Sequence, residues 1–310
     1  MSRRRRKGKI VNGIILLDKP QGLTSNRALQ TVKRLFQAQK AGHTGSLDPL
    51  ATGLLPLCFG EATKISGFLL NAYKSYQVRL QLGITTDSGD ADGTILEQCR
   101  VPELTAPFIV SVLEKFTGEI SQIPPMHSAL KKNGVPLYKL AHQGISIERS
   151  ARKVVIERLD LTLQEGDFLE LSVRCSKGTY IRTLVEDIGA KLECGAHVVA
   201  LRRTAVDPFN VGQACRMYTL EDLEKLAIDS TALHACLLSI DSALHDWPKI
   251  ELGEEAGYFI KQGQAVFVPK VSGHGLVRLY TRNEGFLGVG EFNKDGKISP
   301  KRLMVNAKIG

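Results

Sequence analysis

The sequence contains no long run of apolar residues. No stretch approaches the roughly 18–20 residues that a membrane-spanning helix needs. The basic N-terminus is followed by one short apolar run, Ile14–Leu17, which ends in Asp18-Lys19-Pro20 instead of a small-residue cleavage site. This pattern argues against a signal peptide and against a membrane partner. We therefore expect a cytoplasmic protein.

Paired cysteines and clustered metal ligands are also missing. The six cysteines include no Cys-x-x-Cys pair, and the seven histidines do not lie near them at the spacing of a metal site. A structural zinc site and a framework of disulfides are therefore both disfavoured. We expect no metal, and we expect most of the cysteines to be buried, reduced thiols.

Acidic residues are fewer than basic ones. The chain carries 32 Asp and Glu against 41 Lys and Arg, which gives a net charge of +9. Such a balance favours a polyanionic partner, nucleic acid before a membrane, although some basic proteins bind neither. The run Arg3–Lys9 concentrates part of this charge. We expect residues 1–10 to form a basic, disordered arm that touches phosphates.

The most distinctive stretch of the sequence is a loop rich in glycine. It reads GHTGSLDPLATG from Gly42 to Gly53, and Asp48 is its only acidic residue. Glycine supplies backbone conformations that other residues avoid, and Pro49 restricts the residue before it. A single carboxylate held on such a loop can act as a nucleophile or a general base, whereas an ordinary Asp-Pro only caps a turn. The residues alone leave both interpretations open.

The rest of the chain mixes strands and helices without a strict βαβ order. Alternating or continuous apolar residues predict strands, and apolar residues at helical spacing predict helices. The predicted strands are 13–17, 54–59, 74–83, 94–98, 154–163, 168–175 and 197–206. The predicted helices are 28–36, with an N-cap offered by Thr24-Ser25, and 61–70, 107–116, 138–142, 179–192 and 220–238. This order predicts an α+β fold with a mixed, mostly antiparallel sheet flanked by helices.

Two segments interrupt this pattern. Asp87–Gly93 holds three aspartates, but its spacing does not fit a calcium loop of the EF-hand type. We interpret it as an acidic hairpin or a recognition turn. Ile123–Leu130, followed by the turn Asn133-Gly134, predicts an insertion on the surface.

The character of the sequence changes after Pro248. Glycines separate short strand-like stretches from Lys249 onward, which is the pattern of a small β module. At about 100–200 residues per domain, 310 residues allow one large domain and a small one. We therefore predict a large domain over residues 11–248 and a C-terminal β module over residues 249–310.

Several motifs in a fixed order resemble the TruB family of tRNA pseudouridine synthases. They are LDKPQG at residues 17–22, GHTGSLDPLATGLLP at 42–56, GEATK at 60–64, KSY at 74–76, SKGTYIRTL at 176–184 and GAHVVALRRT at 195–204. The resemblance implies the pseudouridine synthase fold of bacterial members, with the catalytic domain over residues 11–248 and a PUA-like RNA-binding domain over residues 249–310. It also implies a monomer that isomerises the T-loop uridine of tRNA, at position 55, without a metal or an organic cofactor.

The same resemblance implies roles for individual residues. Asp48 is the nucleophile, which attacks the ribose C1′ or acts through a glycal. Tyr76 stacks on the uracil and can take a ribose proton, and Arg182 pairs with Asp48 and keeps it ionised. The further substrate-binding residues that the family implies are His43, which fills space left by the opened RNA loop, Tyr180 and Leu201, which line the base pocket, and Lys19 and Pro20, which support its floor.

Each of these residues also has an ordinary structural interpretation. Without the family match, Tyr76 and Leu201 would be core residues of strands, Arg182 a surface arginine of a helix and His43 a hydrogen-bonding loop residue. The joint occurrence of the motifs in order favours the functional interpretation.

Three other kinds of function fit parts of the sequence. A phosphate-binding loop would need the Gly-Lys-Ser/Thr ending that this loop lacks. A glycoside hydrolase would need a second carboxylate, for which the motifs offer only Glu61 and Asp18. An RNA-binding protein without catalysis would suit the charge but would not need Asp48. We therefore favour a tRNA pseudouridine synthase.

Overall fold

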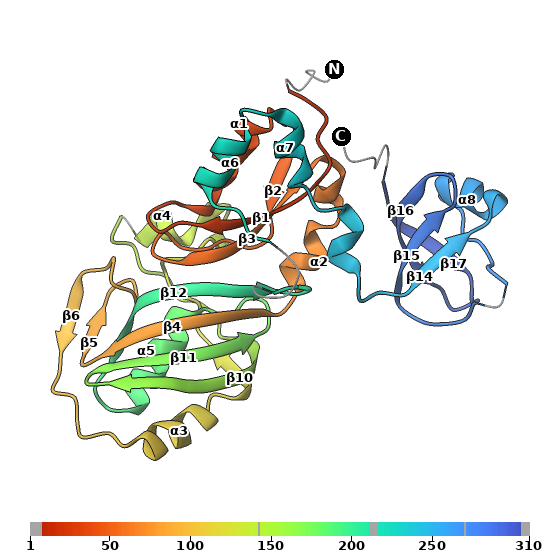
Figure 1. Cartoon of the computed structure of the whole chain (residues 1–310). Helices are drawn as coiled ribbons and strands as arrows, with labels where there is room; N and C mark the ends of the chain where they lie inside the picture. The colour runs from red at the N-terminus through yellow and green to blue at the C-terminus, as the bar shows by residue number, and fades with distance from the viewer. Residues whose placement is uncertain (1–7, 142, 211–215, 270, 305–310) are drawn as a thin grey trace.

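The computed structural model describes residues 8–141, 143–210, 216–269 and 271–304 (Figure 1). Most of the predicted basic arm lies outside these residues, as do His142, the predicted end of one helix, and Cys215. The described part of the arm pairs with the chain after the first helix. The Lys9 N–H donates to the Gln37 carbonyl at 2.7 Å, and Gln39 Nε2 donates to the Gly8 carbonyl at 2.7 Å.

One sheet organises the larger part of the chain. Its strands follow the order β1 (Gly13–Lys19), β3 (Thr52–Phe59), β12 (Ala196–Val206), β4 (Lys74–Leu82), β11 (Phe168–Cys175), β10 (Arg152–Glu165) and β7 (Gly118–Gln122), with β2 (Ala41–His43) beside β3 and β13 (Phe209–Asn210) beside β12. The β12–β3 pair is parallel, and the other pairs of this sheet among the described residues are antiparallel. The predicted mixed, mostly antiparallel sheet is therefore confirmed.

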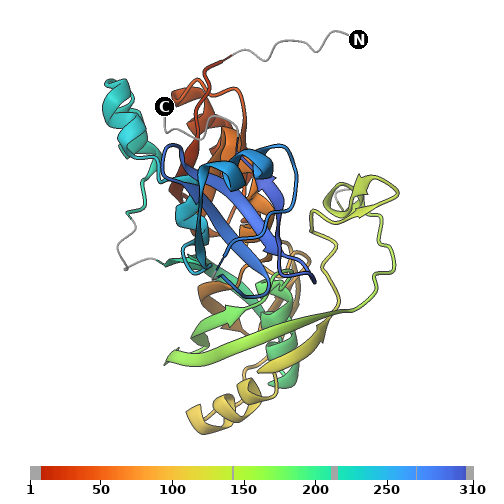
Figure 2. The ribbon, with the colours of Figure 1, turned by 90° about the vertical axis from the view of Figure 1, so that its right-hand side faces the viewer.

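Helices cover one face of the part of this sheet that is formed by β12, β4, β11, β10 and β7. Along β4 the side chains of Tyr76, Val78, Leu80 and Leu82 are buried, whereas Gln77 between them is exposed. The buried face lies against α5 (Ile181–Lys191), while α3 (Ala106–Glu114) packs beside β10 (Figures 1 and 2). Because strand side chains alternate between the faces, this burial explains the alternating sequence pattern.

The other part of the sheet, formed by β1, β3 and β2, is covered by α1 (Ser25–Leu35), α6 (Leu220–Leu226) and α7 (Ser230–Ala235). Thr24 caps α1, because its Oγ1 accepts the Arg27 N–H at 3.2 Å. The prediction of one continuous helix over residues 220–238 is wrong. Asp229 interrupts it and starts α7 by accepting the Thr231 N–H at 2.8 Å. The predicted helix 61–70 is likewise divided into a 3₁₀ helix, η1 (Gly60–Lys64), and α2 (Ser66–Asn71).

Two excursions leave the sheet. The first is a hairpin of β5 (Ile84–Thr86) and β6 (Ile95–Gln98), which confirms the predicted hairpin around the acidic segment. The second, which we call the insertion, comprises residues 123–141 and 143–151. It contains β8 (Lys131–Lys132), β9 (Val135–Pro136) and α4 (Leu137–Ala141), and Figure 2 shows it projecting from the sheet, as the sequence predicted.

The C-terminal part forms a second sheet with its own core. After η2 (Ile240–Leu244), the strands β14 (Lys249–Leu252), β15 (Leu276–Thr281), β16 (Gly285–Phe292) and β17 (Ile298–Leu303) are neighbours in this order. The glycine-separated pattern of the sequence predicted these short strands but not α8 (Glu254–Lys261). An α+β fold with a small C-terminal β module is therefore confirmed.

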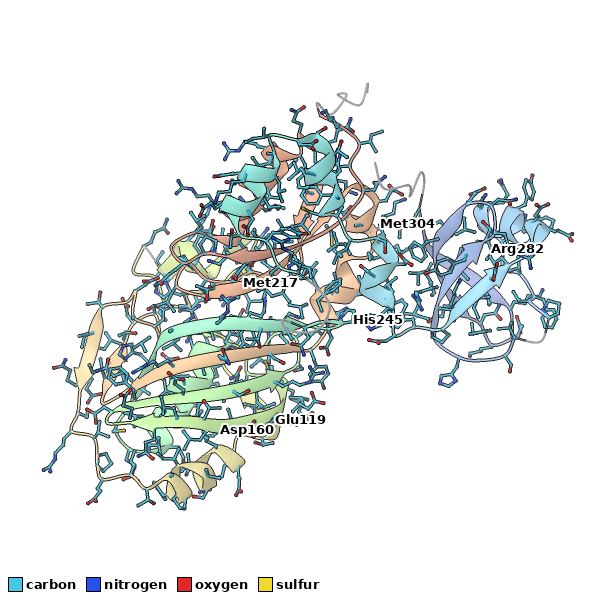
Figure 3. The ribbon with its side chains drawn as sticks, viewed as in Figure 1. Glu119, Asp160, Met217, His245, Arg282 and Met304 are labelled. Carbon is cyan, nitrogen blue, oxygen red and sulfur yellow. The ribbon has the colours of Figure 1, made fainter. Side chains whose placement is uncertain are left out.

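The β module and the larger part of the chain share an apolar contact. Val289 and Met304 of the module pack in one buried cluster with Ile14 and Leu54 of the large sheet, and Figure 3 shows Met304 on the side of the module that faces the rest of the chain. Lys64 Nζ also donates to the Leu303 carbonyl at 2.8 Å. The division at residue 248 stays a prediction, because the two parts do not have wholly separate cores. Among the described residues, no helix is both long and apolar enough to span a membrane.

Candidate active site

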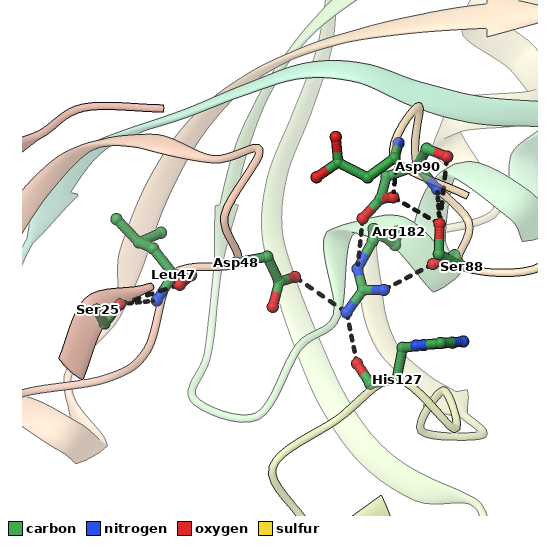
Figure 4. Close-up of polar contacts among 8 residues, drawn as sticks. Ser25, Leu47, Asp48, Ser88, Asp90, His127 and Arg182 are labelled. Carbon is green, nitrogen blue, oxygen red and sulfur yellow. Dashed lines mark hydrogen bonds and ion pairs between the residues drawn. The ribbon is translucent and has the colours of Figure 1, made fainter. Parts of the chain in front are cut away.

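The loop between β2 and β3 presents Asp48 and is held from two sides. On one side, Ser25 Oγ accepts the Leu47 N–H at 2.7 Å and donates to the Leu47 carbonyl at 3.0 Å (Figure 4). On the other side, the Gly22 N–H donates to the Pro49 carbonyl at 2.8 Å. The residues before and after Asp48 are therefore fixed, so the position of its carboxylate is set by the loop.

Glycine is required at the end of this loop. Gly53 has a φ of +96°, in the left-handed region that side chains disfavour, and a Cβ there would collide with the main chain of Arg203. The close approach lets β3 meet β12 in a parallel pairing. The glycine pattern seen in the sequence therefore reflects how the loop joins the two halves of the sheet.

Arg182 lies in the first turn of α5 and connects three separate segments. Its Nη2 is 2.9 Å from Asp48 Oδ2 and donates to the His127 carbonyl at 2.7 Å. Its Nη1 donates to the Ser88 carbonyl at 2.6 Å (Figure 4). Arg182 is only 5% exposed, so the solvated surface arginine considered from the sequence is wrong. The guanidinium joins the Asp48 loop, the β5–β6 turn and the insertion.

A second carboxylate, that of Asp90, contacts Arg182 at the Nε atom of its guanidinium. Asp90 Oδ2 lies 3.6 Å from Arg182 Nε, and Asp90 Oδ1 accepts from Ser88 Oγ at 2.5 Å and from the Asp92 N–H at 3.2 Å. The acidic turn thus supplies a buried counterion for Arg182. The sequence showed the acidic turn but gave no signal that it faces α5.

The charge of Asp48 is set by opposing effects. Protein atoms surround the carboxyl group, and this burial raises the pKa of Asp48, whereas Arg182 lowers it and Asp90 adds to the increase. However, 45% of the side-chain surface is still accessible to solvent. Because water reaches the carboxylate and Arg182 contacts it, we infer that Asp48 is ionised near neutral pH.

Tyr76 and Leu201 lie on the neighbouring strands β4 and β12, beside a buried arginine, Arg203, to which the sequence motifs gave no role. Arg203 is 1% exposed and lies opposite Tyr76 across β4 and β12. It donates to the Leu54 carbonyl at 2.7 Å and to the Gly45 carbonyl at 3.1 Å. Burial raises the pKa of Tyr76, with Arg203 opposing this effect, so the phenol stays neutral. Tyr76 and Leu201 share one apolar cluster with Leu47 of the loop.

Tyr180 is the last residue before α5 and is half-buried. Burial raises the pKa of its phenol. Its main chain is held by Gln122, the last residue of β7: the Tyr180 N–H donates to Gln122 Oε1 at 3.1 Å, and Gln122 Nε2 donates to the Tyr180 carbonyl at 3.3 Å. Gln122 could not be identified from the sequence, because nothing in the local pattern marks a partner so far along the chain.

His43 is the last residue of β2. Burial lowers the pKa of this half-buried imidazole, and the charge of Arg203 lowers it further, so the ring is neutral at neutral pH. Its Nδ1 is buried without a hydrogen-bond partner among the described residues. A buried ring nitrogen of this kind is suited to meet a ligand.

Lys19 holds the Asp48 loop through hydrogen bonds, whereas Pro20 lies at the surface. The fully buried Lys19 Nζ donates to the carbonyls of Leu23 at 2.7 Å, Pro20 at 2.8 Å and Pro49 at 3.4 Å. Burial lowers the pKa of Lys19 to about 8, with the charge of Asp48 opposing this effect. Because its donors are used within the protein, Lys19 holds the turn against the Asp48 loop. Pro20 is exposed and takes part through its carbonyl.

The arrangement brings together one accessible carboxylate, one buried arginine and neutral aromatic side chains. Such a set can attack or stabilise an electron-poor carbon beside a planar ring. In the described part of the chain, no three His, Cys, Asp or Glu side chains gather as a metal site would need.

Comparison with family models gives three matches in succession along the chain. Residues 33–181 match the TruB family pseudouridylate synthase (N terminal domain). Residues 182–245 match the tRNA pseudouridylate synthase B C-terminal domain, and residues 248–304 match the model described as Pseudouridine synthase II TruB, C-terminal.

Curated relatives resemble the whole chain. A tRNA pseudouridine synthase B of Ectopseudomonas mendocina is 55% identical over 296 residues, which are 95% of each chain. Proteins of the same name from Stutzerimonas stutzeri and Coxiella burnetii are each 52% identical, over 98% and 95% of this chain and 99% and 95% of theirs.

Solved structures resemble the fold. A chain in an H/ACA RNP bound to a substrate RNA containing 2′-deoxyuridine aligns with a TM-score of 0.74 at 23% identity, over 99% of this chain and 92% of that one. A chain of a Cbf5-Nop10-Gar1 complex aligns with the same TM-score at 25% identity, over 97% and 87%. Together with the family models, these likenesses confirm the predicted pseudouridine synthase fold.

Proposed function

The chain belongs to the TruB family of pseudouridylate synthases, and from this premise we propose that it isomerises the T-loop uridine at position 55 of tRNA to pseudouridine. The pair of Asp48 and Arg182 carries this proposal, because it places one accessible carboxylate against a buried cation at 2.9 Å. The full-length relatives are named as tRNA pseudouridine synthases, which supports tRNA as the substrate.

The reaction requires a carboxylate and a base pocket, but no redox or phosphoryl chemistry. The bond between ribose C1′ and uracil N1 breaks, the base turns, and a bond from C1′ to uracil C5 forms. The proton lost from C5 is balanced by one gained at N1, so the product is an isomer of the substrate. No metal or organic cofactor is needed for this balance, and we propose that none is used.

We propose a separate role in this reaction for each of three site residues. In our proposal, Asp48 acts at the sugar, either by attack on C1′ or through a glycal, and Arg182 holds its carboxylate as an anion. Tyr76 stacks on the uracil; because its phenol is neutral, it can take a ribose proton only as a phenolate, after it has given up its own proton. A base must leave its stack to reach such a site, and stacking on an aromatic ring offsets part of that cost.

The remaining residues would shape the base pocket. We propose that Tyr180 and Leu201 line it, that His43 fills the space left by the opened T-loop, and that Lys19 and Pro20 support its floor. The neutral imidazole of His43 fits this role because it adds no charge against the uracil. We further propose that the protein acts as a monomer on the T stem-loop of tRNA in the cytoplasm, and that its basic arm touches phosphates.

A direct assay tests the proposed function. Unmodified tRNA transcript is incubated with the protein, and pseudouridine is mapped by carbodiimide treatment and primer extension. We expect one new stop at the T-loop uridine, and none with a transcript that carries cytidine at that position. Tight binding without a stop would instead favour an RNA-binding protein without catalysis.

A further inference from the structure

Gln122 makes a two-point contact with the main chain just before α5. It is 2% exposed, and both halves of its carboxamide are used on one residue: Oε1 accepts the Tyr180 N–H at 3.1 Å, and Nε2 donates to the Tyr180 carbonyl at 3.3 Å. A neutral amide is suited to this because it offers a donor and an acceptor side by side. The contact joins two residues that lie 58 positions apart in the sequence.

This contact fixes the start of the helix that carries Arg182. Tyr180 occupies the N-cap position of α5, and no side chain caps the helix there. Its carbonyl also accepts the Leu184 N–H at 3.0 Å, so the residue held by Gln122 is part of the first helical turn. Arg182 lies two positions further on, and therefore its guanidinium is placed by a turn whose origin Gln122 determines.

The same contact lies where the insertion leaves the sheet. Gln122 ends β7, opposite Arg152 in the register with β10, and the insertion runs between these two strands. On the β10 side, Val155 and Ser176 exchange hydrogen bonds, with the Val155 N–H donating to Ser176 Oγ at 2.9 Å and the Ser176 N–H donating to the Val155 carbonyl at 2.8 Å. The segment 176–180 is thus held at both ends by the strands that bracket the insertion.

The insertion also touches the arginine directly. The His127 carbonyl accepts from Arg182 Nη2, the same nitrogen that contacts Asp48. If the start of α5 moved relative to β7, Arg182 could not keep both contacts. A displacement of about 1 Å in a catalytic constellation can cost on the order of a hundredfold in rate.

We propose that Gln122 is a positioning residue for the isomerisation: its carboxamide fixes the main chain of Tyr180 so that Arg182 meets Asp48 while the insertion stays joined to the same turn. This role rests on the proposed function. It predicts that loss of the contact slows the chemical step at saturating tRNA more than it weakens tRNA binding.

The test uses the full chain with unmodified tRNA and measures the single-turnover rate, tRNA affinity by filter binding, and thermal melting. Gln122→Met keeps the length of the side chain but loses both hydrogen bonds. We expect its rate at saturating tRNA to fall by about 10- to 100-fold, with affinity changed by about threefold or less. Gln164→Met is the control for the substitution itself, because Gln164 is exposed and also bonds a main-chain carbonyl, that of Leu104 at 2.9 Å, but does so away from α5. We expect the control to keep the wild-type rate.

A second variant has a pH signature that a merely stabilising residue would not produce. In Gln122→Glu, an ionised carboxylate can accept the Tyr180 N–H but cannot donate to the Tyr180 carbonyl, whereas the protonated acid can do both. The ratio of the variant's rate to that of the wild type should therefore rise as the pH falls. Taking the ratio at each pH removes the titration that Asp48 shows in both proteins, and Gln122→Met, which adds no charge, should show no such rise.

The outcomes separate the two proposals. A Gln122→Met rate within about twofold of wild type, a loss confined to tRNA affinity, or a lower melting temperature with a normal rate would each overturn the role of Gln122. If Gln122→Met does not fold, a flat ratio for Gln122→Glu overturns it instead. A wild-type protein that binds tRNA but forms no pseudouridine would overturn the proposed function itself.

Discussion

Arg182 and Asp48 meet at 2.9 Å, and the nitrogen that contacts the carboxylate also donates to the carbonyl of His127. The two residues come from the first turn of α5 and from the loop between β2 and β3, on opposite halves of the sheet. Because Arg182 is buried and Asp48 is partly accessible, the pair leaves part of the carboxylate surface free to contact a substrate.

Arg182→Lys should lose most of the activity and little of the tRNA affinity. The guanidinium reaches Asp48, Ser88 and His127 at once through its two terminal nitrogens, and a lysine ammonium cannot reproduce that planar arrangement. We expect the single-turnover rate to fall by about a hundredfold or more. Arg174→Lys is the control, since Arg174 binds Asp207 through two nitrogens outside the site. Near wild-type turnover for Arg182→Lys would remove Arg182 from the catalytic machinery.

Substitutions that remove the charge of Arg182 or of Asp90 should shift the pH profile of the rate in opposite directions. We expect the rate to rise with pH as the Asp48 carboxyl loses its proton. Burial raises the pKa of Asp48, so this rise, the acid limb of the profile, should lie above the usual range for an aspartate. Arg182 lowers this pKa and Asp90 raises it. Therefore Arg182→Met should move the acid limb to higher pH, and Asp90→Asn should move it to lower pH.

The control for this profile lies in the same turn. Asp87→Asn changes a carboxylate that accepts the Thr94 N–H at 2.8 Å, and it should leave the limb in place. Single-turnover rates across the acidic range give the profile. If Arg182→Met and Asp90→Asn shifted the acid limb of the profile in the same direction, that limb would belong to a group other than Asp48.

The sequence predicted the elements whose signals are local. Alternating burial along β4 and the cap at Thr24 are properties of adjacent residues, so they could be recognised without the fold. The helix α8 was missed because glycines around it suggested strands, and the break at Asp229 was missed because the apolar spacing continues on both sides.

Asp48 and Arg182 were identified from motifs, but their surroundings were not. Gln122 lies 58 residues from Tyr180, and Arg203 lies 158 residues from Gly45. Such contacts depend on which strands become neighbours in the sheet, and no periodicity in the sequence encodes that order. The contacts around these candidate residues therefore required the structure, whereas the candidates themselves could be proposed from motifs.

Removing the C-terminal module should weaken tRNA binding without ending catalysis. All the candidate catalytic residues precede Pro248, so a protein truncated after Pro248 should still convert uridine at saturating tRNA. The shared apolar contact adds a second expectation: exposing Ile14 and Leu54, which pack in one cluster with Val289 and Met304, should lower the melting temperature. Filter binding, single-turnover rates and thermal melting test these effects. Loss of all activity in a folded truncation would contradict this prediction.

Asp48→Asn should abolish pseudouridine formation while the protein still folds and binds tRNA. Asparagine keeps the size of aspartate and most of its ability to form the turn, in which the Asp48 carbonyl accepts the Ala51 N–H at 3.1 Å. If Asp48 only caps a turn, the change should cost about 1 kcal/mol of stability or less and leave turnover intact. If it is the nucleophile, turnover is lost, because the amide has no anionic oxygen to act on the ribose.

The two interpretations of Asp48 agree on stability and diverge by orders of magnitude in rate, so the decisive measurement is single-turnover conversion of the T-loop uridine, beside melting and filter binding. Asp207→Asn is the matched control, because Asp207 also pairs with an arginine but does so outside the site, at 2.7 Å from Arg174 Nη2. We expect the control to keep its rate. An Asp48→Asn rate within about tenfold of wild type, equivalent to about 1.4 kcal/mol in the barrier, would make Asp48 structural and place the chemistry on another residue.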